Sequence, residues 1–266
     1  MFAWKYKTER TLIVFSIVSV LALILVIAPV ANTLLSHSPQ DLANTAIEPE
    51  VYNAIFLSLY AALFTSIAAL ILGVPLAFIL SRKQFAGKSI VESLVDLPLV
   101  IPHTVAGIAV LLVWGRTGIF GAPINDIFGV QFYGTVAGIV VAMLFVSFPF
   151  MVNSAREGFE GISPDIEQAA RTLGASPFEV FRRISLPLAF RGIMVGALLV
   201  WARAISEFGA VYIIAYYPMT APILIADQYL QFGLKASSAI AALLLIITLI
   251  IFVLLRFVIL KRKVKE

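Results

Sequence analysis

Residues 51–80 read VYNAIFLSLYAALFTSIAALILGVPLAFIL and contain no Asp, Glu, Lys or Arg. A helix needs about 20 consecutive apolar residues to cross the hydrocarbon core of a bilayer, so this run is long enough to span a membrane. Its apolar residues are continuous and do not alternate with polar ones, which favours a helix over a strand of a membrane barrel. The stretch therefore predicts a transmembrane helix.

The composition of the whole chain points the same way. Of its 266 residues, 61% are hydrophobic and 13% are charged, whereas soluble domains average about 45–50% apolar and about 25% charged residues. The mean hydropathy is +1.01. These values exclude a disordered chain, a nucleic-acid-binding module and an ordinary soluble enzyme, and they predict an integral membrane protein. The chain has no cysteine, which excludes a disulfide framework and a thiolate metal site.

Six stretches are long and apolar enough to be spans, and the fifth of them contains Arg203 and Glu207, the latter the only acid that we expect inside the membrane. The six predicted spans are residues 11–35, 51–80, 97–115, 127–153, 192–218 and 236–255. The first is too long for the apolar region of a signal peptide, so we expect it to stay as an anchor. We predict an all-α, polytopic membrane bundle of six transmembrane helices that forms a single domain over residues 1–266.

Proline and glycine punctuate several of these spans. Gly73 and Pro75 are expected to break the second span, Pro98 and Pro102 to interrupt the third, and Pro149 lies late in the fourth. Transporters use broken helices, but proline and glycine are also common in ordinary membrane helices. Between the last two spans, an apolar run within residues 216–235 fits a short helix at the outer mouth and an interfacial loop equally well.

The cations give the orientation. If the N-terminus is cytoplasmic, sixteen of the nineteen Lys and Arg residues lie in cytoplasmic segments, and only Arg116 and Lys235 lie in exterior loops. Cytoplasmic loops of membrane proteins carry the excess of Lys and Arg. We therefore expect both termini to be cytoplasmic, in a multi-pass protein of the plasma membrane of a prokaryote.

Catalytic and nucleotide-binding patterns are missing from the sequence. His37 and His103 are the only histidines, and they form no cluster with metal-ligand spacing. Residues 87–89 read Gly-Lys-Ser, like the end of a phosphate-binding loop, but Arg82 stands where the first glycine of that loop belongs. We expect no enzyme activity, no metal and no cofactor in this chain, so the energy for any transport must come from a partner or from a gradient.

Residues 154–191 form the only large loop on the predicted cytoplasmic side. Ser163-Pro164-Asp165 has the pattern of a helix start, and Gly174 that of a helix end. Residues 176–179, Ser-Pro-Phe-Glu, form a capping box for a second helix, which we expect to run through Arg183 and to end before Pro187. The loop should form a rigid knob with Phe178 and Phe181 near one face. Such a knob can pack on its own bundle, but a docking surface for a soluble partner is the better explanation.

The same loop resembles the "EAA" loop of ATP-binding-cassette importer permeases, whose pattern is E-A-A, three residues, Gly, nine residues, I-x-L-P. Residues of this chain match it at the right spacing: Ala169, Ala170, Gly174, Ile184, Leu186 and Pro187. The leading acid is replaced by Gln168, and Glu167 stands one position earlier. The resemblance implies that the loop, with its capping box Ser176, Pro177, Phe178 and Glu179, couples the permease to its ATPase.

The resemblance extends from the second predicted span to the sixth. Residues 96–98, 101–107 (Ile-Pro-His-Thr-Val-Ala-Gly) and 203–210 (Arg-Ala-Ile-Ser-Glu-Phe-Gly-Ala) look like the molybdate/tungstate branch of the family, which is close to the sulfate branch. It implies a type I importer fold, in which two permease copies form the pathway. It also implies that two cytoplasmic ATPase subunits, which bind ATP and Mg²⁺, dock on the loop, and that an external binding protein delivers the oxyanion.

Two groups of residues are candidates for the translocation pathway. Pro102, His103 and Thr104 lie at the predicted inner end of the third span, where free helix N–H groups face an anion or where a helix simply begins. Arg203 lies roughly 18 Å into the fifth span, counted from Arg191 at about 1.5 Å per residue. A central Arg costs about 2.5–3.5 kcal/mol to insert, which excludes a lipid-facing position. Glu207 can pair with Arg203, either as a structural ion pair or to hold Arg203 beside the pathway.

Three alternatives to a molybdate or tungstate importer remain open at this point. A sulfate or thiosulfate permease of the same class shares the motifs. A secondary transporter driven by an ion gradient should contain more intramembrane acids and an internal repeat. A membrane-embedded hydrolase is disfavoured because no catalytic constellation that includes a histidine is present.

The cation distribution generates the first testable prediction. Because the native chain has no cysteine, single cysteines at positions 45 and 175 can be labelled with a membrane-impermeant thiol reagent in intact cells. We expect labelling at position 45, which lies outside, and protection at position 175 until the membrane is opened. Labelling of position 175 from outside would contradict the orientation.

Overall fold

The computed structural model describes residues 10–261 and is built from helices throughout that range. Lys5, Lys7 and the last cations of the C-terminal tail lie outside the described residues. The helices are α1 (Arg10–Leu35), α2 (Pro39–Ala46), α3 (Pro49–Arg82), α4 (Lys88–Asp96), α5 (His103–Trp114), α6 (Gly121–Phe128), α7 (Val136–Glu160), α8 (Pro164–Thr172), α9 (Pro177–Val180), α10 (Leu186–Ile205), α11 (Gly209–Ile214), α12 (Ala221–Phe232) and α13 (Leu234–Lys261). A 3-10 turn, Leu97–Leu99, follows α4, and a π turn, Phe181–Ser185, joins α9 to α10.

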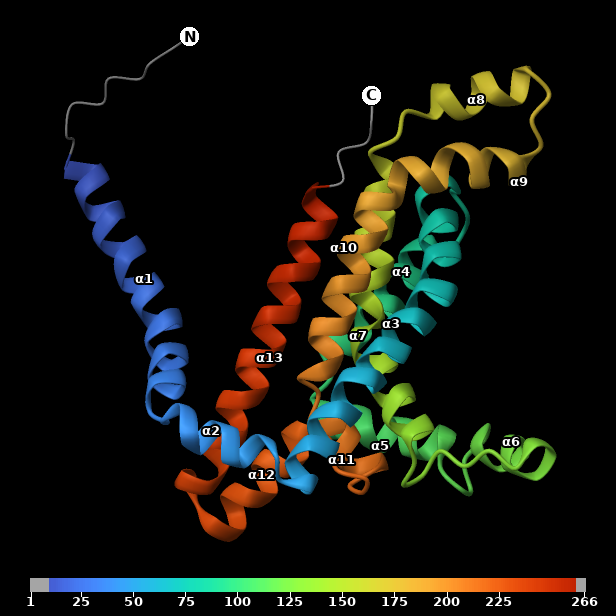
Figure 1. Ribbon diagram of the computed structural model, residues 1–266. Coiled ribbons are helices and arrows are strands. Elements are labelled where there is room, and N and C mark those ends of the chain that lie inside the picture. The colour runs from blue at the N-terminus through green and yellow to red at the C-terminus, as the bar shows by residue number, and fades with distance from the viewer. Residues whose placement is uncertain (1–9, 262–266) are drawn as a thin grey trace.

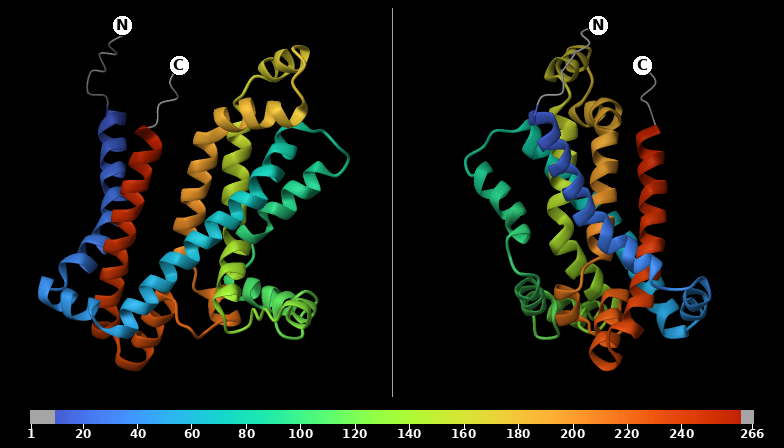
Figure 2. Two further views of the ribbon diagram at one scale, coloured as in Figure 1. Left: turned by 45° about the vertical axis from the view of Figure 1, so that its right-hand side comes forward. Right: turned by 90° about the vertical axis from the view of Figure 1, so that its left-hand side faces the viewer.

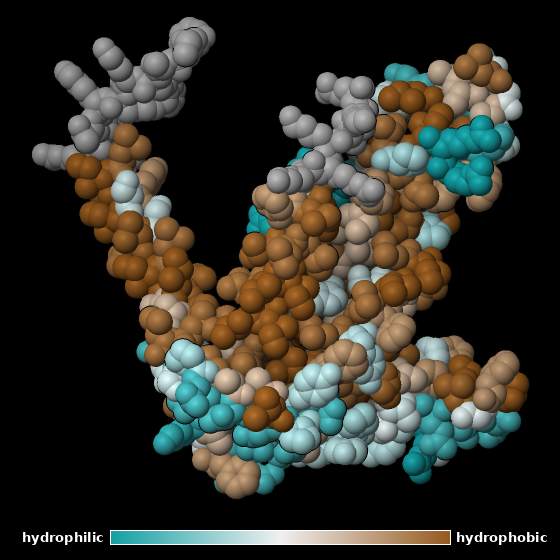
Figure 3. Space-filling model, in the orientation of Figure 1, coloured by the Kyte–Doolittle hydropathy of each residue, from teal (hydrophilic) through white to brown (hydrophobic). Residues whose placement is uncertain are grey.

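Five of these elements are long and apolar enough to cross a membrane, namely α1, α3, α7, the continuous helix from α9 through α10, and α13. A sixth span exists only as a bent pair, in which Lys88–Leu99 and His103–Trp114 meet at 114°. Figure 3 shows exposed hydrophobic residues over α1, α10 and α13, between hydrophilic groups at the two ends. The all-α membrane bundle predicted from the sequence is confirmed.

The centre of the bundle consists of α3, α7 and α10 (Figures 1 and 2). Small residues let these helices approach closely. A Cβ on Gly73 would lie 2.7 Å from Met151 Cγ, and one on Gly192 would lie 2.8 Å from the Cα of Gly158. Lipid tails are as apolar as the side chains, so close van der Waals packing of this kind holds membrane helices together. Gly73 thus serves the contact between α3 and α7, and the predicted break of the second span at Gly73 and Pro75 is wrong because α3 is continuous.

The ends of the bundle differ in construction. The start of α1, the end of α13 and the α8–α9 segment lie at one end, as Figure 1 shows. At the other end, α2, α5, α6, α11 and α12 form a layer of short helices. Of the two alternatives for residues 216–235, the short helix is correct, since α12 occupies Ala221–Phe232. Helix α1 lies at the edge of the bundle, where it contacts α13, and none of its apolar window is buried.

Three predicted spans have different boundaries in the structure. The third was expected at 97–115 but enters the bundle at Lys88, because the acids of α4 have partners on α7: Glu92 accepts from Arg156 at 2.9 Å and Asp96 from Asn153 at 2.7 Å. Glu207 is therefore not the only acid within the spans. The fourth begins at Val136 instead of residue 127, because Gly129 and Gly134 turn the chain before Thr135 caps α7.

The fifth predicted span also differs at both ends. It was expected over residues 192–218, but the helix reaches back to Pro177 and stops at Ile205. After a break at 206–208, the short helix α11 follows. This break and the one at 100–102 leave helix ends whose backbone groups need hydrogen-bond partners.

Candidate functional site

Both ends of α8 have the capping geometry that the sequence predicts. The Ser163 hydroxyl accepts a hydrogen bond from the Asp165 N–H at 3.3 Å at the start of the helix. At its end, the Ala175 N–H donates to the Ala170 carbonyl at 3.1 Å and the Gly174 N–H to the Arg171 carbonyl at 2.9 Å. These two bonds form a Schellman motif, which places its Gly in the left-handed region, here at φ +92°.

The second part of the knob begins with a complete capping box. The Ser176 hydroxyl accepts from the Glu179 N–H at 3.3 Å, and the Glu179 carboxylate accepts from the Ser176 N–H at 3.0 Å. The hydrogen bonds from Ser176 hold the pKa of Glu179 below its usual value. The cap satisfies backbone N–H groups at the helix start, so it fixes the direction in which α9 leaves the turn.

The predicted end of this helix before Pro187 is wrong. The π turn Phe181–Ser185 leads directly into α10, and the Leu186 N–H bonds to the carbonyl of Phe181, five residues earlier. A proline in a helix interior has no N–H to donate and clashes with the preceding turn. Pro187 instead lies in the first turn of α10, where the widened turn accommodates it, so Ile184 and Leu186 belong to one continuous helix that enters the bundle.

The apolar tip of the knob differs in one residue from the prediction. Phe178 is 68% exposed, as expected, and Leu173 at the end of α8 is 89% exposed. Phe181, however, points into the bundle, where its ring centroid lies 4.8 Å from that of Phe78. The exposed surface of the knob also includes Gln168, Ala169, Gly174 and Pro177. The structure thus presents most of the predicted coupling residues on one exposed segment.

One buried polar contact of the loop was not predicted. Glu167 is only 7% exposed, and its carboxylate accepts hydrogen bonds from Arg82 at the end of α3 and from Ser185 in the π turn. The sequence contained a signal for this contact. Gln168 occupies the position of the family's glutamate, and Glu167 stands one position before it. A shift of one position moves a side chain by about 100° around a helix, which turns this acid inward.

The predicted pathway residues come together where two helices break. Pro102 precedes the first turn of α5, and His103 is the first residue of that helix. Gly209 packs against His103, since a Cβ on Gly209 would lie 2.7 Å from His103 Cβ. A Cβ on Gly107 would lie 2.9 Å from the Cα of Ala210. These contacts between α5 and α11 require glycine. The expected position of His103 at the inner end of the third span is wrong, because α4 precedes it and His103 lies at the break within the span.

His103, Arg203 and Glu207 form one polar cluster at these breaks. Arg203 Nη2 donates to Glu207 Oε2 at 2.7 Å and lies 3.1 Å from both ring nitrogens of His103. The other Glu207 oxygen accepts from the Ala210 N–H at 2.8 Å, in the first turn of α11. The ion pair predicted between Arg203 and Glu207 is therefore present.

Burial distinguishes the members of this cluster. The side chain of Glu207 is 1% exposed, that of Arg203 22% and that of His103 52%. Thr104 is exposed next to His103. The acid is thus enclosed by protein, while the cation and the imidazole face the open side of the bundle. An arrangement of this kind offers hydrogen-bond donors to an anion and withdraws the carboxylate that would repel it.

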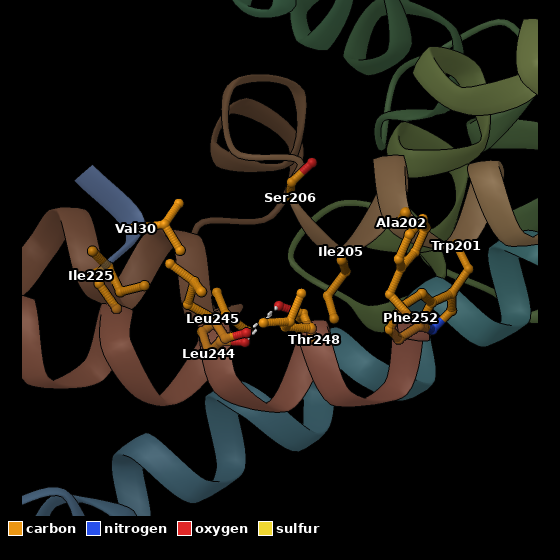
Figure 4. Close-up of a pocket in the computed structure, with 12 residues that line it drawn as sticks. Val30, Trp201, Ala202, Ile205, Ser206, Ile225, Leu244, Leu245, Thr248 and Phe252 are labelled. Atoms are coloured by element: carbon orange, nitrogen blue, oxygen red, sulfur yellow. Dashed lines mark hydrogen bonds between the residues drawn. The ribbon is translucent and has the colours of Figure 1, made fainter. Parts of the chain in front are cut away.

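The apolar cavity in Figure 4 is a different kind of site. It has a volume of about 490 Å³ and lies between α10 and α13, with Trp201, Leu244 and Phe252 among its lining residues. Its Thr248 hydroxyl already donates to the carbonyl of Leu244 at 2.7 Å. No charged side chain lines it. The cavity suits hydrocarbon and cannot replace the hydration shell of an anion.

Comparison with known proteins gives concordant matches. The family described as binding-protein-dependent transport system inner membrane component matches residues 69–266. The chain is 43% identical over 255 residues to the molybdate/tungstate transport system permease protein of Thermococcus kodakarensis, covering 95% of this chain and 98% of that protein. It is 45% identical to the protein of the same description from Pyrococcus abyssi, covering 84% of each. The fold resembles a chain in the crystal structure of a bacterial alginate ABC transporter in complex with a periplasmic protein bound to alginate pentasaccharide, with a TM-score of 0.72, 15% identity and coverage of 96% and 95%.

The left-handed turn at Gly174 generates the second prediction. Gly174→Val puts a β-branched side chain at φ +92°, which costs about 1–2 kcal/mol for a residue with a Cβ. We expect faster amide hydrogen exchange in residues 164–180 and unchanged exchange in α3 and α7. The control is Gly161→Ala at the end of α7, just before α8. Its φ is −69°, and the nearest atom to a new Cβ is 3.5 Å away. Equal exchange in both variants would show that the turn does not need glycine.

Proposed function

The chain belongs to the family of binding-protein-dependent transport system inner membrane components, and on this basis we propose that it carries molybdate or tungstate across the membrane. It is the permease subunit of an ATP-driven importer and not itself an enzyme. The observation that carries the substrate is the relatedness to molybdate/tungstate permeases over nearly the whole chain. Within the family this favours molybdate and tungstate over sulfate or thiosulfate.

We propose that a cytoplasmic ATPase subunit docks on the α8–α9 knob. The knob exposes Leu173 and Phe178 at its tip, and capped helix ends and the Schellman turn keep that tip in one shape. The loop contains the motif that resembles the family's coupling pattern, and the sequence contains no phosphate-binding loop of its own. ATP and Mg²⁺ therefore bind in the partner, and the orientation with the knob and both termini in the cytoplasm follows from the cation distribution.

The pathway in this proposal lies between two copies of the chain. In a single copy, the side chains of His103 and Arg203 are 52% and 22% exposed, and Thr104 is exposed beside them. A second copy related by twofold symmetry would place the same residues opposite and complete the pathway. A binding protein on the exterior side delivers the oxyanion, as the presence of a periplasmic protein in the related alginate transporter structure supports.

Arg203 and His103 give this pathway its chemistry. Nη2 makes the polar contacts of Arg203 with His103 and Glu207, which leaves Nη1 and Nε directed at neither partner. These donors can replace part of an oxyanion's hydration. Because Glu207 balances the charge of Arg203, the cluster attracts an anion only mildly, and the anion leaves again. A strong, uncompensated cation would instead retain it.

Transport itself is the test of the proposed function. The permease is reconstituted in proteoliposomes with its ATPase and its binding protein, and uptake of radiolabelled molybdate or tungstate is measured. We expect uptake that depends on ATP and is abolished by an excess of either oxyanion but not by sulfate. Competition by sulfate at equal concentration would indicate a sulfate permease, and uptake driven by an ion gradient without ATP would indicate a secondary transporter.

The mid-bundle cluster gives a further prediction. Arg203→Gln removes the cation but keeps a hydrogen-bonding side chain of similar length, so we expect oxyanion uptake to fall while assembly and basal ATPase activity persist. Arg156→Gln is the matched control, because Arg156 also pairs with a glutamate, Glu92, at 2.9 Å but lies away from the cluster.

Two outcomes would contradict this role. Loss of assembly together with uptake in Arg203→Gln would show that the pair with Glu207 is a structural ion pair. Uptake at the rate of the unmodified protein would show that Arg203 has neither role. A fall in uptake of the same size in Arg156→Gln would mean that the effect is not specific to the pathway.

A further inference from the structure

An ion pair outside the proposed pathway joins the knob to the membrane bundle. Arg82 Nε lies 3.0 Å from both carboxylate oxygens of Glu167, and Arg82 Nη2 lies 2.9 Å from Oε1. The Ser185 hydroxyl donates to the same Oε1 at 2.8 Å. The side chains of Arg82 and Glu167 are only 14% and 10% exposed, and Ser185 is fully buried. Glu167 thus has well-formed partners on two other elements.

These three residues belong to three different parts of the machinery. Arg82 is the last residue of α3, Glu167 lies in the first turns of α8, and Ser185 ends the π turn that leads into α10. Arg82 Nη2 also approaches the carbonyl of Ile162, just before α8, at 3.4 Å. The carboxylate therefore connects the knob to two long helices of the bundle at a single point.

An aromatic cluster supports this point from the side of the membrane. The ring of Phe78 on α3 lies 4.8 Å from that of Phe181 in the π turn and 5.2 Å from that of Phe159 on α7. These rings fill the space between the elements that Glu167 connects. A packed aromatic contact beside a bidentate ion pair leaves the junction little freedom to rotate.

Removal of one partner would have a specific effect. A buried guanidinium or carboxylate without its counter-charge must recruit water or move outward. Either response would separate α8 from the end of α3, while the cap of α9, the exposed tip and the mid-bundle cluster would remain intact. The junction can thus be loosened without removing the surface on which a partner docks.

We propose that Glu167, held by Arg82 and Ser185, is the positioning residue that transmits movement of the docked ATPase from the knob to α3 and α10 together. The proposal rests on the proposed function, because it assigns a route to the coupling between ATP hydrolysis and transport. Without this junction the ATPase still docks on Leu173 and Phe178 and still turns over, but the knob moves without the helices.

The test compares the number of oxyanions imported per ATP hydrolysed in reconstituted complexes. The variants are Glu167→Gln and Arg82→Gln, which remove the charge of either partner, and Ser185→Ala, which removes only the third contact. Glu92→Gln is the matched control, because Glu92 also pairs with an arginine at 2.9 Å but connects α4 to α7 and not to the knob.

A second measurement does not depend on the transported substrate. Because the native chain has no cysteine, spin labels can be attached to Lys83→Cys after α3 and Thr172→Cys at the end of α8, two exposed positions. The distribution of the distance between them reports whether the knob and α3 move together. It is measured in the unmodified background and in Glu167→Gln, with and without ATP and the ATPase.

We expect the import-to-hydrolysis ratio to fall about fivefold or more in Glu167→Gln and Arg82→Gln, the lower end of typical coupling factors between sites. Ser185→Ala should lower it less, and Glu92→Gln should leave it unchanged. The label distance should be narrow and insensitive to ATP in the unmodified background and broad in Glu167→Gln. If Glu167→Gln does not assemble, Ser185→Ala provides the same test in milder form.

An unchanged ratio in every variant that assembles, together with an unchanged label distance, would overturn the proposal and leave the pair a purely structural contact. Loss of ATPase binding would also overturn it, because it would assign Glu167 to docking. Failure of the unmodified complex to transport an oxyanion would contradict the proposed function, whereas the label distances would still decide whether the junction couples the knob to α3.

Discussion

The carboxylate of Glu207 satisfies two demands at the point where α10 stops inside the bundle. One oxygen neutralises Arg203 at 2.7 Å, and the other accepts the Ala210 N–H at the start of α11. Both demands are severe in a membrane, because an unpaired charge or backbone group there has no water to bind. One buried acid therefore permits a cation, a helix break and the close approach of α5 in the same place, and the arrangement of the proposed pathway depends on it.

The helices of the bundle differ in how closely they pack. Glycine contacts bring α7 against both α3 and α10, and buried alanines fill much of the core between them. In contrast, none of the apolar window of α1 is buried, and its exposed leucines and valines match lipid or another chain. A rigid centre of three helices with less tightly packed helices around it is suited to transmitting force along α3 and α10 without deforming the core.

The sequence predicted the elements whose signals are local. Spans appear as apolar runs, and the caps at Ser163, Gly174 and Ser176 appear as residue types at fixed spacing. It missed features that depend on tertiary partners. Helix α4 contains Glu92 and Asp96, which end the apolar run and are accommodated only because α7 supplies partners. Two further features depend on contacts with α3. Phe181 of the π turn packs against Phe78, and Glu167 points inward to bind Arg82. The sequence placed His103 and Arg203 in the same pathway but did not predict that they are in contact. Residues 100 positions apart give no local signal that the two helix breaks lie side by side.

The position of α10 relates the two ends of the molecule. Its residues Leu186–Ile205 extend about 30 Å at 1.5 Å per residue, from the π turn beside Glu167 to the cluster around Arg203. The helix has no interruption over this length, so under the proposed coupling a displacement at the knob would reach Arg203. At the far end, Glu207 bridges the break through Arg203 and the Ala210 N–H, and so ties the start of α11 to the end of α10. The break at 100–102 has no such bridge among the described side-chain hydrogen bonds, and Val100 there is 82% exposed. If α10 and α11 move together, as the proposed coupling requires, the unbridged break before His103 is where the chain can bend, beside the proposed oxyanion pathway.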